Sequence, residues 1–222
     1  MAEYYHHPIG LNNAFGGEII SIRAGESSFH IHETLMKESS TLLHSLRKQK
    51  ETKGNVYTLS IPDEYTEALQ CYINWVYRRV IPCADSEQQT RKESITLAKA
   101  YIIGKKFGDT DFQNAIIDEV IERASGKCNN NIILPDAETV RFTYAESKGR
   151  SSFRPLLVEL YASYTINGYF YKSASSKYPK LFLIDVLSAV AEMQRTGRPS
   201  PTEGGPGHVC KHFHKHAQGT KC

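Results

Sequence analysis

Apolar and polar residues alternate with a period of two in three short segments of the N-terminal half. Such alternation predicts half-buried strands, because successive side chains of a strand point to opposite faces of its sheet. The first two segments, joined by a Gly25-Glu26-Ser27 turn, predict a hairpin over residues 18–32, and the third predicts a strand over residues 56–61. The apolar positions of these strands are Ile20, Ile22, Ala24, Phe29, Ile31, Leu59 and Ile61.

The broadest apolar surface belongs to a predicted helix over residues 63–79, directly after the third strand. Pro62 ends the strand, Asp63 can cap the helix, and Pro82 limits its continuation. Apolar residues occupy most of the helix circumference, which predicts a core helix with neighbours on more than one side. We expect its interior to contain Leu69, Tyr72, Trp75 and Val76.

Helical spacing of apolar residues predicts further helices on both sides of this core helix. Residues 33–50 are expected to be helical in two pieces. Two more, separated by Gly108, follow a polar stretch over residues 83–93 that we expect to be a loop, and Asp109 or Asp111 can cap the second of them. The C-terminal half predicts three helices, over residues 136–147, 153–164 and 179–193, and the last has an apolar face of Leu183, Val186, Leu187, Val190 and Met193.

These patterns divide the chain into an α+β domain and a small all-helical section. We expect a flexible leader over residues 1–16, the α+β domain over residues 17–126, a linker over residues 127–133 and the helical section over residues 134–194. Residues 195–222 begin with a Gly-, Pro- and Ser-rich composition, which predicts a flexible linker, and finish with a Cys- and His-rich tail.

Composition limits which classes of partner the protein is expected to bind and which cellular compartment it is expected to occupy. The 222 residues carry a net charge of +3, which is too small to indicate nucleic acid or an anionic membrane as the partner. No apolar run is long enough to span a bilayer and the first residues lack a secretory signal, so we expect an intracellular protein of the cytoplasm or nucleus. The five irregularly spaced cysteines fit reduced thiols better than a disulfide framework.

The sequence gives no sign of an enzyme. It lacks a nucleophile elbow, a phosphate-binding loop and a dinucleotide fingerprint, so we expect neither catalysis nor an organic cofactor, and no small-molecule substrate. The adjacent His6 and His7 lack nearby ligand partners and are expected to be solvated. His32, at the end of the second predicted strand, is expected to have a structural role.

The Cys- and His-rich tail is where the residue types suggest chemistry. If residues 209–216 were extended, Cys210, His212, His214 and His216 would point the same way, but a straight strand could not bring them all to one ion. With a bend, the set that suits a tetrahedral zinc site is Cys210, His214, His216 and Cys222, and zinc binding by the tail is our hypothesis. The spacing differs from that of the usual zinc fingers, so the sequence favours the other interpretation, a disordered, weakly basic tail with incidental histidines.

Four motifs in order resemble the BTB/POZ domain over about residues 17–125. They are Phe29-His30-Ile31-His32-Glu33 with Leu35 and Ser39, Ile61-Pro62-Asp63 through Trp75-Val76-Tyr77, Leu97 through Phe107, and Phe112 through Ile117. With the later Leu134-Pro135 and Tyr178-Pro179, the chain resembles fungal proteins that have a single BTB domain and a short helical C-terminal section. The resemblance implies a BTB/POZ fold, with a sheet of three or more strands capped by helical hairpins.

The resemblance also implies a non-catalytic protein–protein interaction module. BTB domains form homodimers, here through about Glu18–Ala24 with Thr34–Leu46, or act as adaptors on a cullin-type ubiquitin-ligase scaffold, here through Tyr77–Ile81 with Phe112–Ile121. The alternative function is a nuclear, transcription-related factor that acts through self-association and a zinc-binding tail. The residues predicted to bind a partner are Tyr77, Arg78, Arg79, Val80 and Ile81.

Some positions depart from the family pattern. Leu42 and Ile103-Gly104 keep the apolar character that the fold needs. Glu33 replaces the basic residue that is usual in the family, and Glu18 stands near where many relatives have Asp. Both lie near surfaces that relatives use for partners, so no specific partner is implied.

Overall fold

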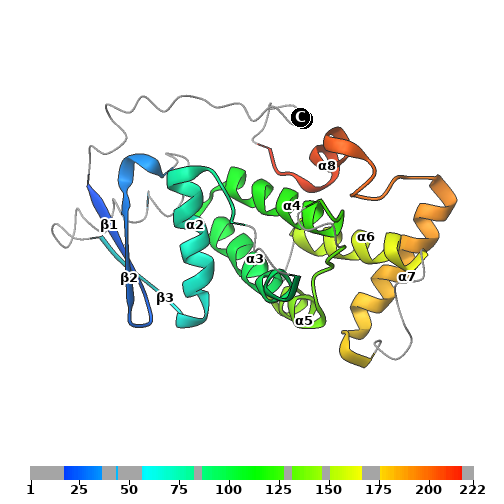
Figure 1. Cartoon of the computed structure of the whole chain (residues 1–222), viewed down its shortest axis with the longest axis horizontal. Coiled ribbons are helices and arrows are strands. Elements are labelled where there is room, and N and C mark those ends of the chain that lie inside the picture. Colours follow the sequence, from blue (N-terminus) through cyan, green and yellow to red (C-terminus); the bar gives the residue numbers. More distant parts are fainter. Residues whose placement is uncertain are drawn as a thin grey trace.

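The sheet at one end of the molecule contains three strands, β1 (Ile19–Ala24), β2 (Ser27–His32) and β3 (Tyr57–Ile61) (Figure 1). The strand order is β2-β1-β3, with β1 antiparallel to β2 and parallel to β3. The three strands predicted from alternation are therefore confirmed. Gly25 turns the hairpin with a φ of 56°, a conformation that favours glycine. The fully buried face of the central strand consists of Ile20, Ile22 and Ala24.

The computed structural model describes residues 18–36, 44, 57–82, 87–127, 132–146, 151–166 and 176–216. In the helical region predicted over residues 33–50, Glu33–Leu35 form a 3-10 turn, η1, and His44 is helical, but Met36 is extended and contradicts the prediction; the remaining residues of this region lie outside the described ones. The predicted leader with His6 and His7 also lies outside them, as does Cys222.

The helix after the sheet connects it to the rest of the core. A 3-10 turn, η2 (Asp63–Tyr65), leads into α2 (Thr66–Arg78), whose buried face contains Leu69, Tyr72 and Val76. The Tyr72 ring meets the rings of Phe107 and Phe112 edge-on, with centroids 4.9 and 5.0 Å apart.

Trp75 departs from the prediction of a fully buried residue, because its ring is only partly buried. Its position on α2 explains this: it lies about 100° around the helix from Val76, at the border of the buried face. The ring is tilted against Phe112 at 6.0 Å, and the Arg79 guanidinium lies 5.3 Å from its centroid on the outer side.

A helical hairpin follows, formed by α3 (Glu87–Phe107) and α4 (Thr110–Ala124). Gly108 has a φ of 71° between them, and Asp109 caps α4 by accepting a hydrogen bond of 2.9 Å from the Phe112 N–H. The loop predicted over residues 83–93 is wrong from residue 87 onward, because α3 already begins there. Glu, Gln, Arg and Lys are good helix formers that leave no apolar pattern to detect.

Two helices pack against this hairpin, α5 (Ala137–Glu146) and α6 (Phe153–Ile166), and a third, α7 (Lys180–Thr196), packs on α6 (Figure 1). Helix α5 contacts α3, and α6 contacts both α4 and α7. Their buried side chains join those of the sheet and α2 in one continuous hydrophobic core. The helical section and the α+β part are therefore packed together.

The apolar face of α7 is narrower than its sequence predicts. The structure buries Phe182, Val186 and Met193, but Leu187 is 67% exposed and so contradicts its predicted core position. Helix α7 packs mainly against a single neighbour, α6, and only one stripe of the helix can therefore be buried.

The Gly- and Pro-rich segment after α7 contains an additional helix, α8 (Gly205–Phe213). This contradicts the flexible linker that the sequence predicts, and it makes residues 209–213 helical where the strand arrangement considered above assumed an extended chain. Pro206 suits the first turn of a helix, where its missing N–H costs nothing. Val209 and Phe213, four residues apart, are buried and anchor α8 over α4 and α6 (Figure 1).

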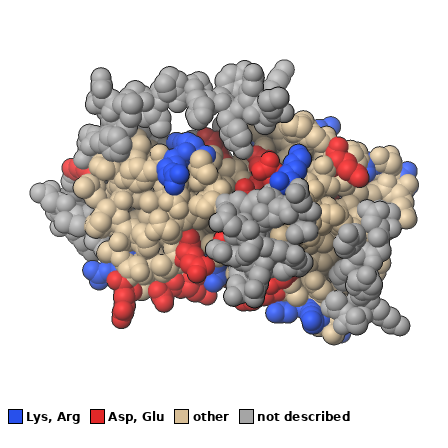
Figure 2. Space-filling model, in the orientation of Figure 1, with Lys and Arg blue, Asp and Glu red and all other residues tan. Residues whose placement is uncertain are grey.

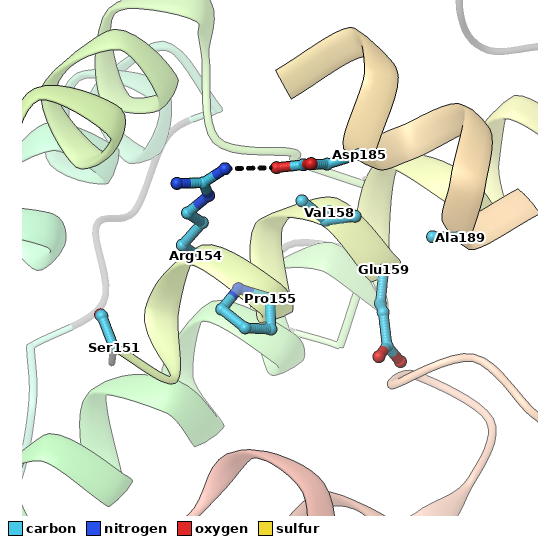
Figure 3. Close-up of a pocket in the computed structure, with 7 residues that line it drawn as sticks. All are labelled: Ser151, Arg154, Pro155, Val158, Glu159, Asp185 and Ala189. Atoms are coloured by element: carbon cyan, nitrogen blue, oxygen red, sulfur yellow. Dashed lines mark hydrogen bonds and ion pairs between the residues drawn. The ribbon is translucent and has the colours of Figure 1, made fainter. Parts of the chain in front are cut away.

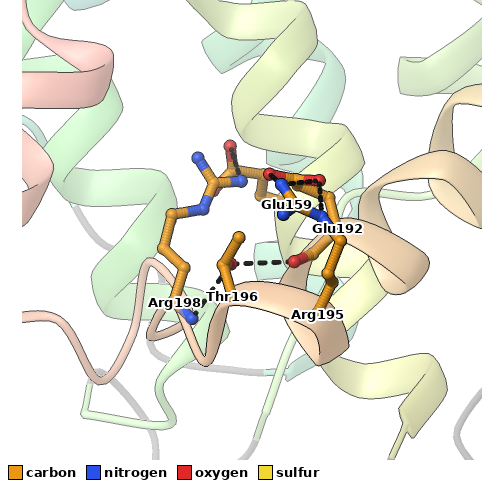
Figure 4. A network of polar contacts seen from close by, with 5 residues as sticks. All are labelled: Glu159, Glu192, Arg195, Thr196 and Arg198. Carbon is orange, nitrogen blue, oxygen red and sulfur yellow. Dashed lines mark hydrogen bonds and ion pairs between the residues drawn. The ribbon is translucent and has the colours of Figure 1, made fainter.

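A polar network fixes the connection between α7 and α8 (Figure 4). Arg195 forms a bidentate ion pair with Glu192, and the Thr196 hydroxyl donates to the Glu192 carbonyl at 2.8 Å. Arg198 reaches α6, where its guanidinium donates to Glu159 at 2.9 Å. The Arg198–Glu159 ion pair thus holds the segment between α7 and α8 against α6.

Candidate functional site

The predicted partner-binding region lies where α2 leaves the core. Tyr77 is 36% exposed and Val80 is 51% exposed, and Arg78 and Arg79 are exposed between them. Arg79 ends the helix in the left-handed conformation with a φ of 54°. Ile81 is partly buried and packs back on the core. The structure therefore presents a short surface of one aromatic, two cationic and one apolar side chain.

Tyr77 also has a structural contact. Its hydroxyl oxygen accepts a hydrogen bond of 3.3 Å from the His32 N–H and lies 2.7 Å from His32 Nδ1. This places His32 in a link between β2 and α2, which is the structural role predicted for it. His30, its neighbour on the same face, pairs instead with Ser21 through Nδ1 and Oγ at 3.0 Å.

The Cys- and His-rich segment forms a cluster at the end of α8. Cys210, His214 and His216 each offer one ligand atom, and these atoms lie within 4.8 Å of one another. The Cys210 sulfur is 3.2 Å from His216 Nε2. The cluster forms because the chain changes from helix to extended backbone at His214, with φ −78° and ψ 155°. Three of the four residues predicted as zinc ligands are therefore brought together.

The fourth predicted ligand, Cys222, lies outside the described residues. His212, which the prediction left out of the ligand set, points elsewhere: its ring packs against that of His208 one turn earlier, with centroids 4.5 Å apart. The helical backbone of α8 therefore separates His212 from the cluster, although all four residues would share one side of a strand.

The two cysteines that the structure describes differ in state. Cys71 on α2 is free, and burial raises the pKa of its thiol to about 12, so it stays protonated and unreactive. Cys210 is disulfide-bonded, which differs from the reduced thiols that the sequence favours. A metal can bind the Cys210 sulfur as a thiolate only after this bond is reduced.

Side chains of α4 lie beside the cluster. The Asp118 carboxylate is 2.9 Å from His214 Nε2, and the Asn114 amide hydrogen-bonds both the N–H and the carbonyl of Lys215. Sequence reasoning missed both residues. They carry no motif, and about 100 residues separate them from the histidines along the chain.

A shallow pocket of about 420 Å³ lies between α6 and α7 (Figure 3). The Arg154 guanidinium and the Asp185 carboxylate point toward each other across it, at 2.6 Å, and Glu159 points away from them. Tyr144 also donates to Asp185, at 2.6 Å. The pocket is lined by Ser151, Arg154, Pro155, Val158, Glu159, Asp185 and Ala189.

Two of the charged groups that line this pocket, Arg154 and Asp185, satisfy each other. Burial opposes ionisation of Asp185, but the hydrogen bonds from Tyr144 and Arg154 and the positive charge of Arg154 hold the pKa of Asp185 below its ordinary value. Arg154 also lies over the Tyr144 ring, 4.0 Å from its centroid. These contacts connect α5, α6 and α7, and the Asp185 carboxylate already accepts hydrogen bonds from Tyr144 and Arg154.

Acidic and basic side chains are interspersed on the face of the molecule that Figure 2 shows. Among the residues that the structure describes, no helix has the length and apolar character needed to cross a membrane. Comparison with family models, curated proteins and solved structures finds no match to this chain.

Proposed function

We propose that this chain is a non-catalytic protein–protein interaction module of the BTB/POZ type, which forms homodimers, binds a cullin-type ubiquitin-ligase scaffold, or does both. The observation that carries the proposal is the topology of the sheet and of the helices that follow it. A hairpin pairs in parallel with a third strand in the order β2-β1-β3, and a core helix and a helical hairpin come next. The four motifs that resemble the BTB/POZ family lie along these elements in the same order.

The surface at the end of α2 supports an interaction role. An exposed apolar residue beside exposed arginines gives a partner both apolar area to bury and charges to pair. Val80 has 51% of its surface exposed at this position, although the adjacent Ile81 packs on the core. Binding would consist of burying this surface, with no covalent step.

Two measurements test the proposal. Light scattering after size exclusion gives the molar mass of the chain, and biolayer interferometry measures its binding to the purified N-terminal domain of a cullin. A dimer mass or saturable cullin binding supports the proposal. A monomer that also fails to bind the cullin domain contradicts it.

A variant then locates the cullin-binding surface. Val80→Asp should weaken cullin binding by at least about tenfold, which corresponds to about 1.4 kcal/mol. Ile132→Asp is the matched control, because Ile132 is 38% exposed and lies outside both regions proposed to bind the scaffold. Equal loss in the two variants would show that Val80 is not part of the interface. A pull-down from the source cells separates the adaptor role, marked by cullin peptides, from the alternative nuclear role, marked by chromatin proteins.

We also propose that the tail binds zinc through Cys210, His214, His216 and Cys222. The clustering of three of these side chains within 4.8 Å supports a shared ion. A phosphine reductant and one water molecule would first convert the Cys210 disulfide to two thiols, the water oxygen passing to the phosphine oxide and its two protons to the thiols. The metal would then displace the proton of the Cys210 thiol. Titration of the reduced full chain with Co²⁺ should give the visible bands of a tetrahedral site in the wild type and not in Cys210→Ser.

A further inference from the structure

The extended segment after α8 lies on α4 through contacts that need no metal. The Asn114 side chain donates from Nδ2 to the Lys215 carbonyl and accepts from the Lys215 N–H at Oδ1, both at 2.9 Å. This pairing satisfies both polar groups of the Lys215 backbone at once, much as a neighbouring strand would. Lys215 stands between His214 and His216, so the pairing fixes the backbone that carries both histidines.

The Lys215 side chain adds two weaker contacts on the same side. Its ammonium group donates to the Gln113 side-chain amide oxygen, Oε1, at 3.4 Å and lies 5.3 Å from the centroid of the Tyr101 ring. An ammonium group over an aromatic face is held by the ring quadrupole. Residues from both α3 and α4 therefore hold the segment in place.

Asp118 lies one helical turn beyond Asn114, on the same face of α4. Its Oδ1 is 2.9 Å from His214 Nε2, and His214 is largely buried, with 14% of its side chain exposed. A carboxylate accepts hydrogen bonds, so this contact places a proton on Nε2 and leaves the lone pair of a neutral imidazole on Nδ1. His214 can then bind a metal only through Nδ1.

His216 has the opposite arrangement. Its Nε2 is the atom that faces the Cys210 sulfur, at 3.2 Å. The two histidines would thus bind one ion through different ring nitrogens. Ligand histidines in proteins are commonly held by a carboxylate on the other nitrogen, and loss of that carboxylate weakens metal binding by about 10- to 100-fold.

We infer that α4 is the supporting element of the metal centre: Asp118 positions His214 for binding through Nδ1, and Asn114 positions the backbone between the two histidine ligands. This inference rests on the proposal that the tail binds zinc. It assigns two positioning residues in the α+β part of the chain to a site at its C-terminal end. Metal binding would then fasten α8 and the segment after it to α4.

Cobalt titration of the reduced full chain tests the inference. Asp118→Asn should raise the Co²⁺ concentration needed for half-saturation by about 10- to 100-fold and retain the tetrahedral bands. Glu122→Gln is the matched control, because it removes a carboxylate from an exposed position one turn further along α4 and should leave the titration unchanged. Asp118→Glu, which keeps a carboxylate, should recover part of the affinity. Asn114→Ala should weaken binding as well.

The outcomes separate the two proposals. A wild type without tetrahedral bands overturns the zinc site itself. A wild type that binds cobalt, with Asp118→Asn equal to Glu122→Gln, leaves the zinc site standing and overturns the role of Asp118. Circular dichroism and thermal unfolding of each variant without metal identify a loss of binding that is due to misfolding, and Asp118→Glu then decides the question.

A spectroscopic measurement tests the same inference without any variant. Long-range ¹H–¹⁵N correlation spectra of the zinc-loaded chain report which nitrogen of each histidine binds the metal. We expect Nδ1 coordination for His214 and Nε2 coordination for His216. Nε2 coordination of His214 would overturn the inference, because that atom would then be unable to hydrogen-bond Asp118 as a donor.

Discussion

Tyr77 shows how one residue can be both exposed and structural. Its hydroxyl oxygen accepts from the His32 N–H, so its own proton is free to be donated to His32 Nδ1, 2.7 Å away. The same side chain is 36% exposed at the proposed interaction surface. A Tyr77 substitution would therefore disturb the link between α2 and β2 as well as the surface. Val80 is the better probe of binding for this reason.

Trp75 should contribute less to stability than a fully buried tryptophan. We expect Trp75→Ala to lower the free energy of unfolding by about 2–3 kcal/mol, compared with about 3–5 kcal/mol for truncation of a buried large aromatic residue. The ring is partly exposed, and its buried Nε1 has no hydrogen-bond partner among the described residues. Urea unfolding followed by circular dichroism measures the difference. A loss below about 1 kcal/mol would show that the contacts with Phe112 and Arg79 contribute little.

At the level of the elements, the sequence predicts those strands and helices whose apolar residues follow the period of the element. Period-two alternation identifies all three strands, and helical spacing identifies α2, α4, α5, α6 and α7 to within a few residues. The first turns of α3 escape detection because they are polar. Helix α8 escapes because Gly and Pro dominate its surroundings, although Val209 and Phe213 at a spacing of four residues are a helical signal.

The Arg198–Glu159 ion pair holds the segment before α8 against α6 and should contribute to the free energy of unfolding. Glu159 is 9% exposed, and burial raises the pKa of its carboxyl group while Arg198 opposes the rise. We expect Arg198→Leu to lower the free energy of unfolding by on the order of 3 kcal/mol, because it leaves a buried carboxylate without its cation. Chemical denaturation at pH 7 measures this loss.

The double variant Arg198→Leu with Glu159→Leu is the control for this effect. It removes the unpaired charge, so it should be more stable than Arg198→Leu alone, since replacing a buried ion pair by apolar residues is often close to neutral. If both variants lost the same free energy, packing of the Arg198 stem would explain the loss and the charge would not.

At the scale of the whole molecule, the candidate metal site shows where sequence reasoning stops. The residue types and the need for a bend are enough to select Cys210, His214 and His216 and to leave out His212. The contacts of the tail with α4 cannot be predicted from the sequence. Asn114 and Asp118 reach the tail only because α8 packs over α4 and α6. Residues about 100 positions apart form no local motif by which such a contact could be recognised in the sequence.

A site that joins α8 to α4 should couple metal binding to the stability of the whole chain. Zinc at about 100 times its dissociation constant should raise the free energy of unfolding of the reduced protein by about 2.7 kcal/mol, because the ion binds the folded chain and not the unfolded one. Urea unfolding with zinc and with a chelator measures this gain, which should vanish in Cys210→Ser.

The size of the gain also tells whether the tail and the core unfold together. Val209 and Phe213 belong to the continuous core, so detaching α8 exposes apolar surface that the rest of the molecule needs covered. The gain should therefore appear in the main unfolding transition. If zinc protected only the amides of α8 and the following segment from hydrogen exchange and left the main transition unchanged, the tail would open separately and the metal would hold it locally.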